Sequence, residues 1–286
     1  MKTLLLSLSL LAAPSLNATN LIVCGTTEVT VINREHPYDA KWSWTAADSP
    51  SIPESFRARF RSTDECKPYT GDFLLITSSS GGVALIDRNT KKCLFLTRSS
   101  NAHSACLLPD NQIVVAASYG GDEMQFFDLS DKRRPAVAAQ ALPCHGAHGA
   151  LWDANRKTLW ALGGDELMAL RRQDGCWHIA SRHPLPTPGG HDLSPAHNGR
   201  HLFITSNSQV LLFDRDSAKF AVHPLIGGEP KVKSVDLHPD TGLTVFHQGT
   251  AGTWWSDTIR FVGGATIRLK DRRLYKVRWD IPIPRP

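Results

Sequence analysis

The chain has 286 residues, of which 41% are hydrophobic and 21% charged, and its formal net charge is +5 with 12 histidines. That composition is typical of a globular protein and excludes a disordered chain. The excess of positive charge favours an acidic ligand, but the lysines and arginines form no long run, so we expect no nucleic-acid partner.

Residues 1–18 are predicted to be a signal peptide. Lys2 gives the positive start, the run from Leu4 to Ala13 is apolar, and Ala18 is the expected residue before cleavage. The run has about ten residues, fewer than the ~20 needed to span a bilayer. No later segment is long and apolar enough to do so. We therefore expect a secreted or periplasmic protein without a membrane span, with residues 19–286 as one domain.

Two units of short strands open the predicted domain. The first unit has strands at 21–25, 28–32 and 41–44 and lacks a fourth. The second has strands at 73–79, 82–87 and 93–97. Its first strand is predicted at residues 57–61, where Arg57, Arg59 and Arg61 alternate with other residues and so share one side.

Four repeated units follow, and each opens with a residue at the same repeat position. These residues are His103, His148, His191 and Lys233, spaced by 45, 43 and 42 residues. Polar turns separate short β-rich runs within each unit. A period of about 43 residues with four short strands is typical of a β-propeller.

The sequence therefore predicts an all-β fold, a single-domain propeller of six four-stranded blades. The strand at 273–279 either completes the first blade or forms the outer strand of the last. Closing the ring with strands from both chain ends would remove free sheet edges. No long segment has a 3.6-residue period, so helices should be scarce.

Strand order assigns the loops to two faces. The lower loops, such as 109–111 and 239–242, have ordinary turn residues whose charges we expect to be solvated. The upper loops lead into the first strand of each blade or join its second and third strands. Basic, aromatic and small residues gather there, as expected of a concave ligand site.

Three histidines and a lysine in matched positions predict a ring around the upper mouth of the central channel. Neutral imidazoles of His103, His148 and His191 could hold one divalent metal ion, with His247, Gln248 or water completing its shell. One of them could instead act as a general base, or the ring could only bind an anionic or sugar ligand. A purely structural role, as in a hydrogen bond between blades, is the other interpretation.

Further residues, most of them in the upper loops, are candidates for binding substrate. They are Lys233, Tyr119, Gln248, Trp255, Asp257 and Arg59. Arg59 belongs to the predicted first strand of the second unit, and a solvated side chain is the other interpretation for it. Asp192 and Asp257 are candidates for orienting a histidine. Most tryptophans should pack between blades, with Trp255 as the expected exception. No GxSxG motif and no phosphate-binding glycine loop occurs, so we expect neither that class of serine hydrolase nor a nucleotide cofactor.

The six cysteines include no CxxC pair, which argues against a zinc ribbon or a thioredoxin-like site. Export would permit disulfides, but a core of this size does not need them. Cys24 and Cys106 lie in apolar runs and are predicted to be buried thiols, and the pairing of the six stays open.

Four motifs are similar to those of a family of secreted bacterial six-bladed β-propellers of unknown function. They are Ala147–Asp153, Leu159–Leu167, Gly189–Leu193 and Trp254–Phe261. The resemblance spans most of the predicted mature chain and implies the fold and export, but no activity. In architecture alone the chain resembles the propeller oligogalacturonate lyases, which hold a divalent metal ion with histidines and a glutamine. The motifs of that family are not matched here.

These observations lead to the hypothesis of a carbohydrate-active enzyme, a lyase on an acidic oligo- or polysaccharide. His148 or His191 is the expected general base or metal ligand, His103 a further ligand or acid, and Lys233 the group that neutralises a carboxylate. The alternative is a non-catalytic propeller that binds a glycan or a protein through the same face. A hydrolase or isomerase using these residues is a third possibility. We expect a monomer.

Overall fold

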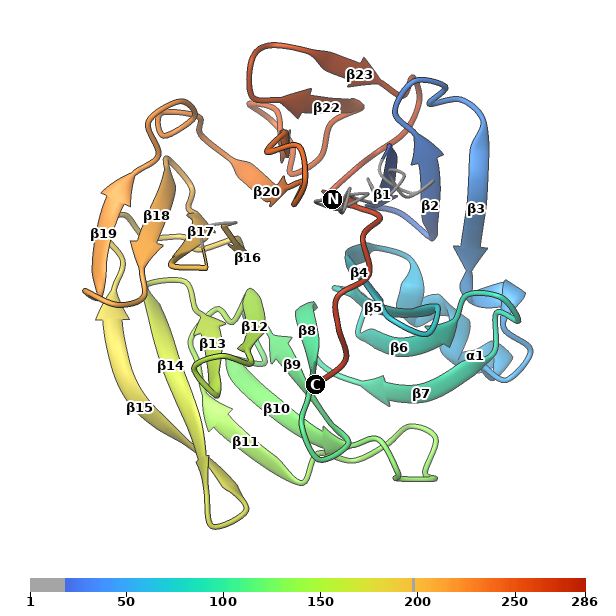
Figure 1. Cartoon of the computed structure of the whole chain (residues 1–286). Helices are drawn as coiled ribbons and strands as arrows, with labels where there is room; N and C mark the ends of the chain where they lie inside the picture. The colour runs from blue at the N-terminus through green and yellow to red at the C-terminus, as the bar shows by residue number, and fades with distance from the viewer. Residues whose placement is uncertain (1–18, 197–198) are drawn as a thin grey trace, which may run out of the picture.

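The computed structural model describes residues 19–196 and 199–286, so the predicted signal peptide, residues 1–18, lies outside the described residues. The strands form six four-stranded antiparallel sheets that stand as blades around a central channel (Figure 1). The prediction of an all-β, six-bladed propeller is confirmed. Helices are as scarce as expected in this part of the chain. They are η1 (Ala46–Asp48), α1 (Glu54–Arg57) and η2 (Ala58–Phe60).

Each blade has its innermost strand at the channel, and the strands below are given from the centre outward. Blade 1 comprises β24 (Lys276–Trp279), β1 (Asn20–Cys24), β2 (Glu28–Asn33) and β3 (Ala40–Thr45). Blade 2 comprises β4 (Thr63–Tyr69), β5 (Phe73–Ser78), β6 (Gly82–Asp87) and β7 (Cys93–Arg98). Blade 3 comprises β8 (Ala102–Leu108), β9 (Gln112–Ala117), β10 (Glu123–Asp128) and β11 (Gln140–Pro143).

The other three blades follow the same plan. Blade 4 comprises β12 (Gly149–Asp153), β13 (Thr158–Leu162), β14 (Glu166–Gln173) and β15 (Cys176–Pro184). Blade 5 comprises β16 (Asp192–Pro195), β17 (His201–Thr205), β18 (Val210–Asp214) and β19 (Lys219–Val222). Blade 6 comprises β20 (Val232–Leu237), β21 (Thr244–Gln248), β22 (Thr258–Phe261) and β23 (Thr266–Arg268).

The two ends of the chain close the ring within blade 1. Strand β24 pairs antiparallel with β1, with Trp279 opposite Leu21 and Lys276 opposite Cys24. Of the two predicted places for the C-terminal strand, the structure therefore has the first. The segment after β24 crosses the lower mouth of the channel, where Ile283 exchanges backbone hydrogen bonds with Pro68 and Thr70 at 2.9 and 3.0 Å (Figure 1).

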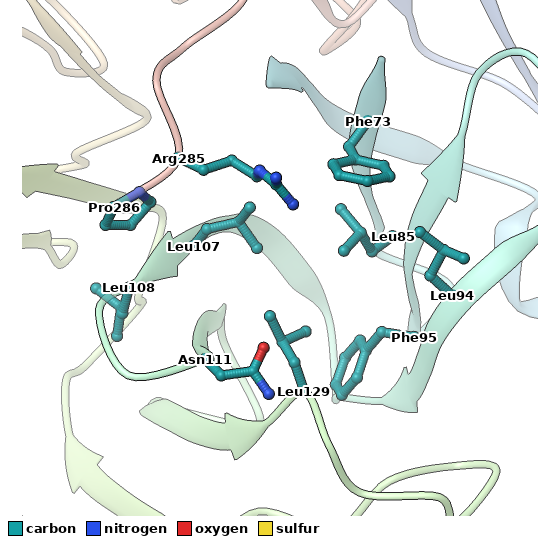
Figure 2. A pocket seen from close by; sticks show the side chains of 10 residues that line it. All are labelled: Phe73, Leu85, Leu94, Phe95, Leu107, Leu108, Asn111, Leu129, Arg285 and Pro286. Atoms are coloured by element: carbon teal, nitrogen blue, oxygen red, sulfur yellow. The ribbon is translucent and has the colours of Figure 1, made fainter. Parts of the chain in front are cut away.

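The last residues of the chain also cover an apolar hollow on the lower face between blades 2 and 3. Figure 2 shows Arg285 and Pro286 beside the side chains that line it. The guanidinium carbon of Arg285 lies 4.7 Å from the centroid of the Phe73 ring. This hollow is thus partly occupied by the chain itself, and it holds few polar groups that could perform chemistry.

The hydrophobic core consists of separate clusters between neighbouring blades. Because each sheet is packed on both sides, its middle strands are apolar throughout rather than alternating, as in the fully buried run Ile113–Ala117 of β9. Large aromatic side chains fill the wider outer part of these wedges. Trp44 of blade 1, for example, meets Phe60 edge-on at 5.4 Å between centroids.

Residues 57–61 do not form the inner strand of blade 2, and that prediction is wrong. Residues 57–60 lie in α1 and η2, Arg61 follows them, and the inner strand is β4. Phe56 and Phe60, four residues apart, are both buried against blade 1, which is the spacing of one helical face. Arg57 and Arg59 lie between these two phenylalanines in the sequence and are half-buried, whereas Arg61 is exposed.

A buried ion cluster fills the middle of the channel. Arg278 and Lys276 of β24 bind the carboxylates of Glu65 and Asp192, which come from the inner strands of blades 2 and 5. All four side chains are at most 6% exposed. We call these four residues the channel ion cluster, and it separates the upper mouth of the channel from the lower one.

All six cysteines lie in the described part of the chain and are free thiols. Cys24 and Cys106 are buried, as predicted, and only Cys176 is exposed. Within the same described ranges, no helix has the length and hydropathy that crossing a membrane requires.

Candidate functional site

One residue from each blade meets at the upper mouth of the channel. In blade order these six residues, which we call the mouth ring, are Tyr275, Asp64, His103, His148, His191 and Lys233. The predicted histidines and lysine are therefore brought together, and a tyrosine and an aspartate complete the ring. Lys233 is fully buried, and His148 is 3% exposed.

All six side chains lie at the start of the inner strand of their blade, and the backbone places them there in one of two ways. Asp64, His103 and Lys233 are the extra residue of a β-bulge between the first and second strands of their blades. The other three residues immediately precede their strands and donate a backbone hydrogen bond of 2.8 Å to the second strand. A bulge turns a side chain out of the normal alternation, and bulges are frequent next to active sites.

His103 and Asp64 form an acid–base pair. His103 Nε2 lies 3.7 Å from Asp64 Oδ1, and Nδ1 donates to the backbone oxygen of Asn101 at 2.9 Å. Burial raises the pKa of the Asp64 carboxyl, against the attraction of His103. Burial also lowers the pKa of His103, against the attraction of Asp64. The two pKa values are thus moved toward each other, which favours transfer of a proton between the two groups.

His148 lies between the other two histidines. Its ring centroid is 4.2 Å from that of His103 and 5.3 Å from that of His191. Nδ1 is 2.7 Å from the backbone oxygen of Gly146 and so donates to it, which leaves Nε2 as the acceptor. Burial, together with the neighbouring histidines, lowers the pKa of His148 well below its usual value, so the imidazole is neutral at pH 7.

His191 and Lys233 are directly coupled. Lys233 Nζ lies 2.8 Å from His191 Nε2, which is also 2.7 Å from Asn207 Oδ1. Nε2 can accept from the ammonium or donate to the amide oxygen, but not both, so the charge of Lys233 and the tautomer of His191 are linked. Burial lowers the pKa of His191 to about 3 and that of Lys233 to about 7.

Two aromatic side chains stand at the rim of the mouth ring. Trp254 is 56% exposed, and its ring centroid lies 4.4 Å from Lys233 Nζ. The rings of Trp254 and His191 meet edge-on with 6.2 Å between their centroids. Tyr119 is 49% exposed and meets His148 at 5.7 Å. A Cβ on Gly146 would come within 2.8 Å of the Tyr119 ring, so this position needs a glycine.

The other predicted binding residues lie outside the ring. Trp255, the tryptophan named from the sequence, stacks with Arg273 at 5.3 Å, whereas Trp254 contacts the ring. Gln248 donates to Glu229 and to the backbone oxygen of Pro230.

The two carboxylates proposed to orient a histidine have other partners. Asp257 binds Arg268 at 2.8 Å, and Asp192 belongs to the channel ion cluster. Of the histidines proposed for a metal shell, His247 is fully buried with Nε2 3.0 Å from Ser256 Oγ, and burial lowers its pKa to about 4.

The donor atoms of the ring are partly engaged. Within residues 19–196 and 199–286, no group of three or more His, Cys, Asp or Glu side chains is arranged to hold a metal ion. Nδ1 of His103 and of His148 face backbone oxygens, and Nε2 of His191 faces Lys233. His103 Nε2, 3.7 Å from Asp64 Oδ1, and His148 Nε2 are left to face a ligand, while His191 Nδ1 is buried without a hydrogen-bond partner among the described residues.

Asp64 and Tyr275 were missed by reasoning from the sequence. Asp64 was missed because the inner strand of blade 2 was predicted at residues 57–61, before its true position in β4. The turn at 70–72 after β4 resembles the turns at 109–111 and 239–242, and this similarity could have located the strand. Tyr275 was missed because the C-terminal strand had no assigned place. Once β24 is the inner strand of blade 1, Tyr275 takes the same position as His148 and His191.

The chain matches one described protein family. Residues 17–169, just over half of the chain, match a family of unknown function. No protein of curated function matches the chain.

Proposed function

The chain belongs to this family of unknown function, DUF6528, and we propose that its mouth ring is an acid–base site acting on an acidic saccharide, with lyase chemistry. One observation carries the proposal. A buried lysine with a pKa near 7 lies in contact with the neutral imidazole of His191, at the end of a channel whose middle is filled by the channel ion cluster. Buried lysines and histidines with shifted pKa values cluster at functional sites.

The reaction that suits these groups is β-elimination from a uronate. The substrate carboxylate is neutralised by Lys233, which acquires its proton as the anion binds. The proton on the carbon next to the carboxylate passes to the Asp64–His103 pair. The C–O bond on the following carbon breaks, a C=C bond forms, and the leaving oxygen takes a proton from a ring acid. Tyr275 is the candidate for that last step because its phenol is protonated at neutral pH, although the burial that raises its pKa also makes it a weaker acid.

The rim supports a saccharide ligand. Trp254 and Tyr119 expose apolar ring faces beside the polar ring, and such faces pack against the C–H groups of a sugar. Export, predicted from residues 1–18, would bring the protein into contact with polysaccharides outside the cytoplasm.

A second candidate is binding without turnover, and the burial of the ring favours it. His103, His148 and His191 are each at most 9% exposed, so a ligand reaches them only at the narrow mouth. A chain end or a single acidic sugar fits this access better than the middle of a polymer. In this case the same residues would recognise a saccharide end group.

A divalent metal ion could bind only to those ring atoms that have no other partner. His103 Nε2 and His148 Nε2 are the nitrogens that would bind it, and water or the ligand would have to complete its shell, because the described residues bring no three His, Cys, Asp or Glu side chains together for a metal ion. Elemental analysis of wild-type protein and of a His103→Gln, His148→Gln double variant tests this directly. Stoichiometric metal in the wild type and none in the variant is the supporting result, and equal metal in both would contradict it.

The test of lyase activity is incubation with a panel of polyuronates, following the ultraviolet absorbance of the C=C product. Lys233→Met and His103→Gln should each abolish product formation. Lys132→Met, which removes an exposed lysine from a lower loop, should leave it unchanged. No product, but saturable binding that Lys233→Met removes, would favour the second candidate. Neither product nor binding would refute both.

A further inference from the structure

A polar groove lies on the upper face between blades 2 and 3, beside the mouth ring. Its volume is about 540 Å³. Arg59 of η2 and Arg98 at the end of β7 form part of its wall. The rest comes from the loops 79–81 and 99–101, both rich in serine, and from Gln125 of β10.

The two arginines of the groove have no carboxylate partner. Within the described ranges, neither guanidinium forms an ion pair or a hydrogen bond, although Arg59 lies 5.9 Å from the Phe56 ring. Other arginines of this protein, such as Arg156 and Arg215, bind aspartates. Two unpaired guanidinium groups facing one polar groove create a site of positive potential suited to an anion.

Two residues that line the groove carry buried polar atoms without partners. Ser99 is 2% exposed, and its Oγ has no hydrogen-bond partner among the described residues. The same holds for Gln125 Oε1, whose amide nitrogen donates to Glu123. Buried hydroxyl and amide groups are nearly always hydrogen-bonded in native proteins, so these atoms indicate a missing partner.

The backbone at Gly81 makes room for one of the arginines. Gly81 has φ +96°, and a Cβ there would lie 3.2 Å from Arg59 Nη1. Ser99 donates its backbone N–H to Gly81 O at 3.2 Å, which joins the two loops. The guanidinium of Arg59 thus lies next to the 79–81 loop in the wall of the groove.

The walls of the groove also hold two members of the mouth ring. The backbone N–H of Ser79 donates to the carboxylate of Asp64. The backbone oxygen of Asn101 accepts from His103 Nδ1 at 2.9 Å. A ligand in the groove would therefore lie against the loops that position the acid–base pair, and a chain of sugars entering the ring would pass over it.

We infer that this groove is an anion-binding subsite. It binds the carboxylate or sulfate of a second sugar, next to the sugar at the mouth ring. The inference rests on the proposed function and specifies its substrate as an oligosaccharide with acidic groups on neighbouring sugars. The planar fork of arginine matches two oxygens of either anion.

Calorimetric binding of three tetrasaccharides tests this inference. The probes are tetragalacturonate, a sulfated heparin-derived tetrasaccharide and neutral maltotetraose. The double variant Arg59→Ala, Arg98→Ala should raise the Kd of the preferred acidic probe about 10- to 100-fold, as expected for loss of charged hydrogen bonds. The double variant Arg59→Lys, Arg98→Lys should raise the Kd less, because lysine keeps the positive charge but lacks the planar fork of arginine. Which acidic probe binds more tightly distinguishes carboxylate from sulfate.

Arg171→Ala is the matched control, because it removes an exposed arginine of β14 in blade 4 whose side chain forms no ion pair or hydrogen bond within residues 19–196 and 199–286. Equal affinities of the double variant and this control would overturn the subsite, as would wild-type protein that binds neither acidic probe. Lys233→Met separates the two proposals. If binding depends on the arginines but not on Lys233, the subsite in the groove is supported and the proposed function of the ring is contradicted. If binding depends on Lys233 but not on the arginines, the function of the ring is supported and the subsite is contradicted.

Discussion

Replacing Arg278 by methionine tests whether the channel ion cluster holds the propeller together. Arg278 donates five hydrogen bonds, four of them to the carboxylates of Glu65 and Asp192 and one to Val235 O. In the variant Lys276 remains as the ion-pair partner of both buried carboxylates, at 3.3 and 2.9 Å, and Lys67 acts on Glu65 from farther away. The cluster then has one uncompensated negative charge, while methionine still fills most of the volume of the arginine stem.

The expected loss is about 3–5 kcal/mol of unfolding free energy, the usual cost of leaving a buried charge without its partner. Solvent screening does not reduce this loss, because the side chains involved are at most 6% exposed. At ~2–4 °C per kcal/mol, the melting temperature should fall by about 6–20 °C. Arg182→Met, which breaks an exposed pair with Glu166, should cost less than about 1 kcal/mol.

Urea unfolding at two pH values gives a sharper readout. The cations of the cluster, acting against burial, lower the pKa of Glu65 and of Asp192 in the folded state. Their contribution to stability is therefore present above the unfolded pKa, 4.5 for a glutamate, and is lost as the pH falls below it. The difference between wild type and Arg278→Met should thus be largest at pH 7 and shrink toward pH 3.

A second substitution should partly reverse the first. In the Arg278→Met, Asp192→Asn double variant, Glu65 and Lys276 balance each other, so this protein should be more stable than Arg278→Met alone. The reasoning would be refuted if Arg278→Met lost no more than Arg182→Met, or if adding Asp192→Asn only increased the loss.

The remaining predictions concern the ring, its rim and the closure. Because Lys233 has a pKa of about 7 and is cationic below it, an anionic saccharide should bind about tenfold more tightly at pH 6 than at pH 8 in calorimetry, and a flat profile would contradict this assignment. Trp254→Ala should raise the Kd of the same saccharide about 2- to 10-fold, whereas Trp255→Ala should not, and the reverse order would restore the sequence-based choice. Removing residues 276–286 should abolish cooperative thermal unfolding, while removing only 281–286 should lower the melting temperature by about 2–8 °C, so a cooperative melt of the shorter chain would disprove closure by β24.

The fold was predictable because the repeat is visible in the sequence. His103, His148, His191 and Lys233 recur at nearly constant spacing, and each occupies the same structural position. A propeller blade contacts mainly its neighbours, so one correctly aligned repeat determines the others. The position of the C-terminal strand was left open because pairing between distant segments leaves no local signal. Leu21 and Trp279 are adjacent only after the ring closes.

The candidate site was predictable to the extent that it follows the repeat. The register of the repeat identified four of the six ring residues. Asp64 was misplaced because α1 and η2 are inserted before β4, where a strand was expected. The preference for Trp255 over Trp254 could not be settled from neighbouring positions in one loop. Which indole lies over Lys233 depends on the path of that loop, and its residues do not repeat elsewhere in the chain.

The same inner strand connects the stability of the propeller with the chemistry of its mouth. In β24 and the residue before it, Tyr275 joins the ring, and Lys276 and Arg278 enter the ion cluster directly below. The charge of Lys276 contributes to lowering the pKa of His103 and of His148, after the larger effect of burial on each. A propeller without this strand would lack a ring member, the cations that balance Glu65 and Asp192, and part of the field that keeps the imidazoles neutral. The site is therefore completed only when the last strand of the chain pairs with the first.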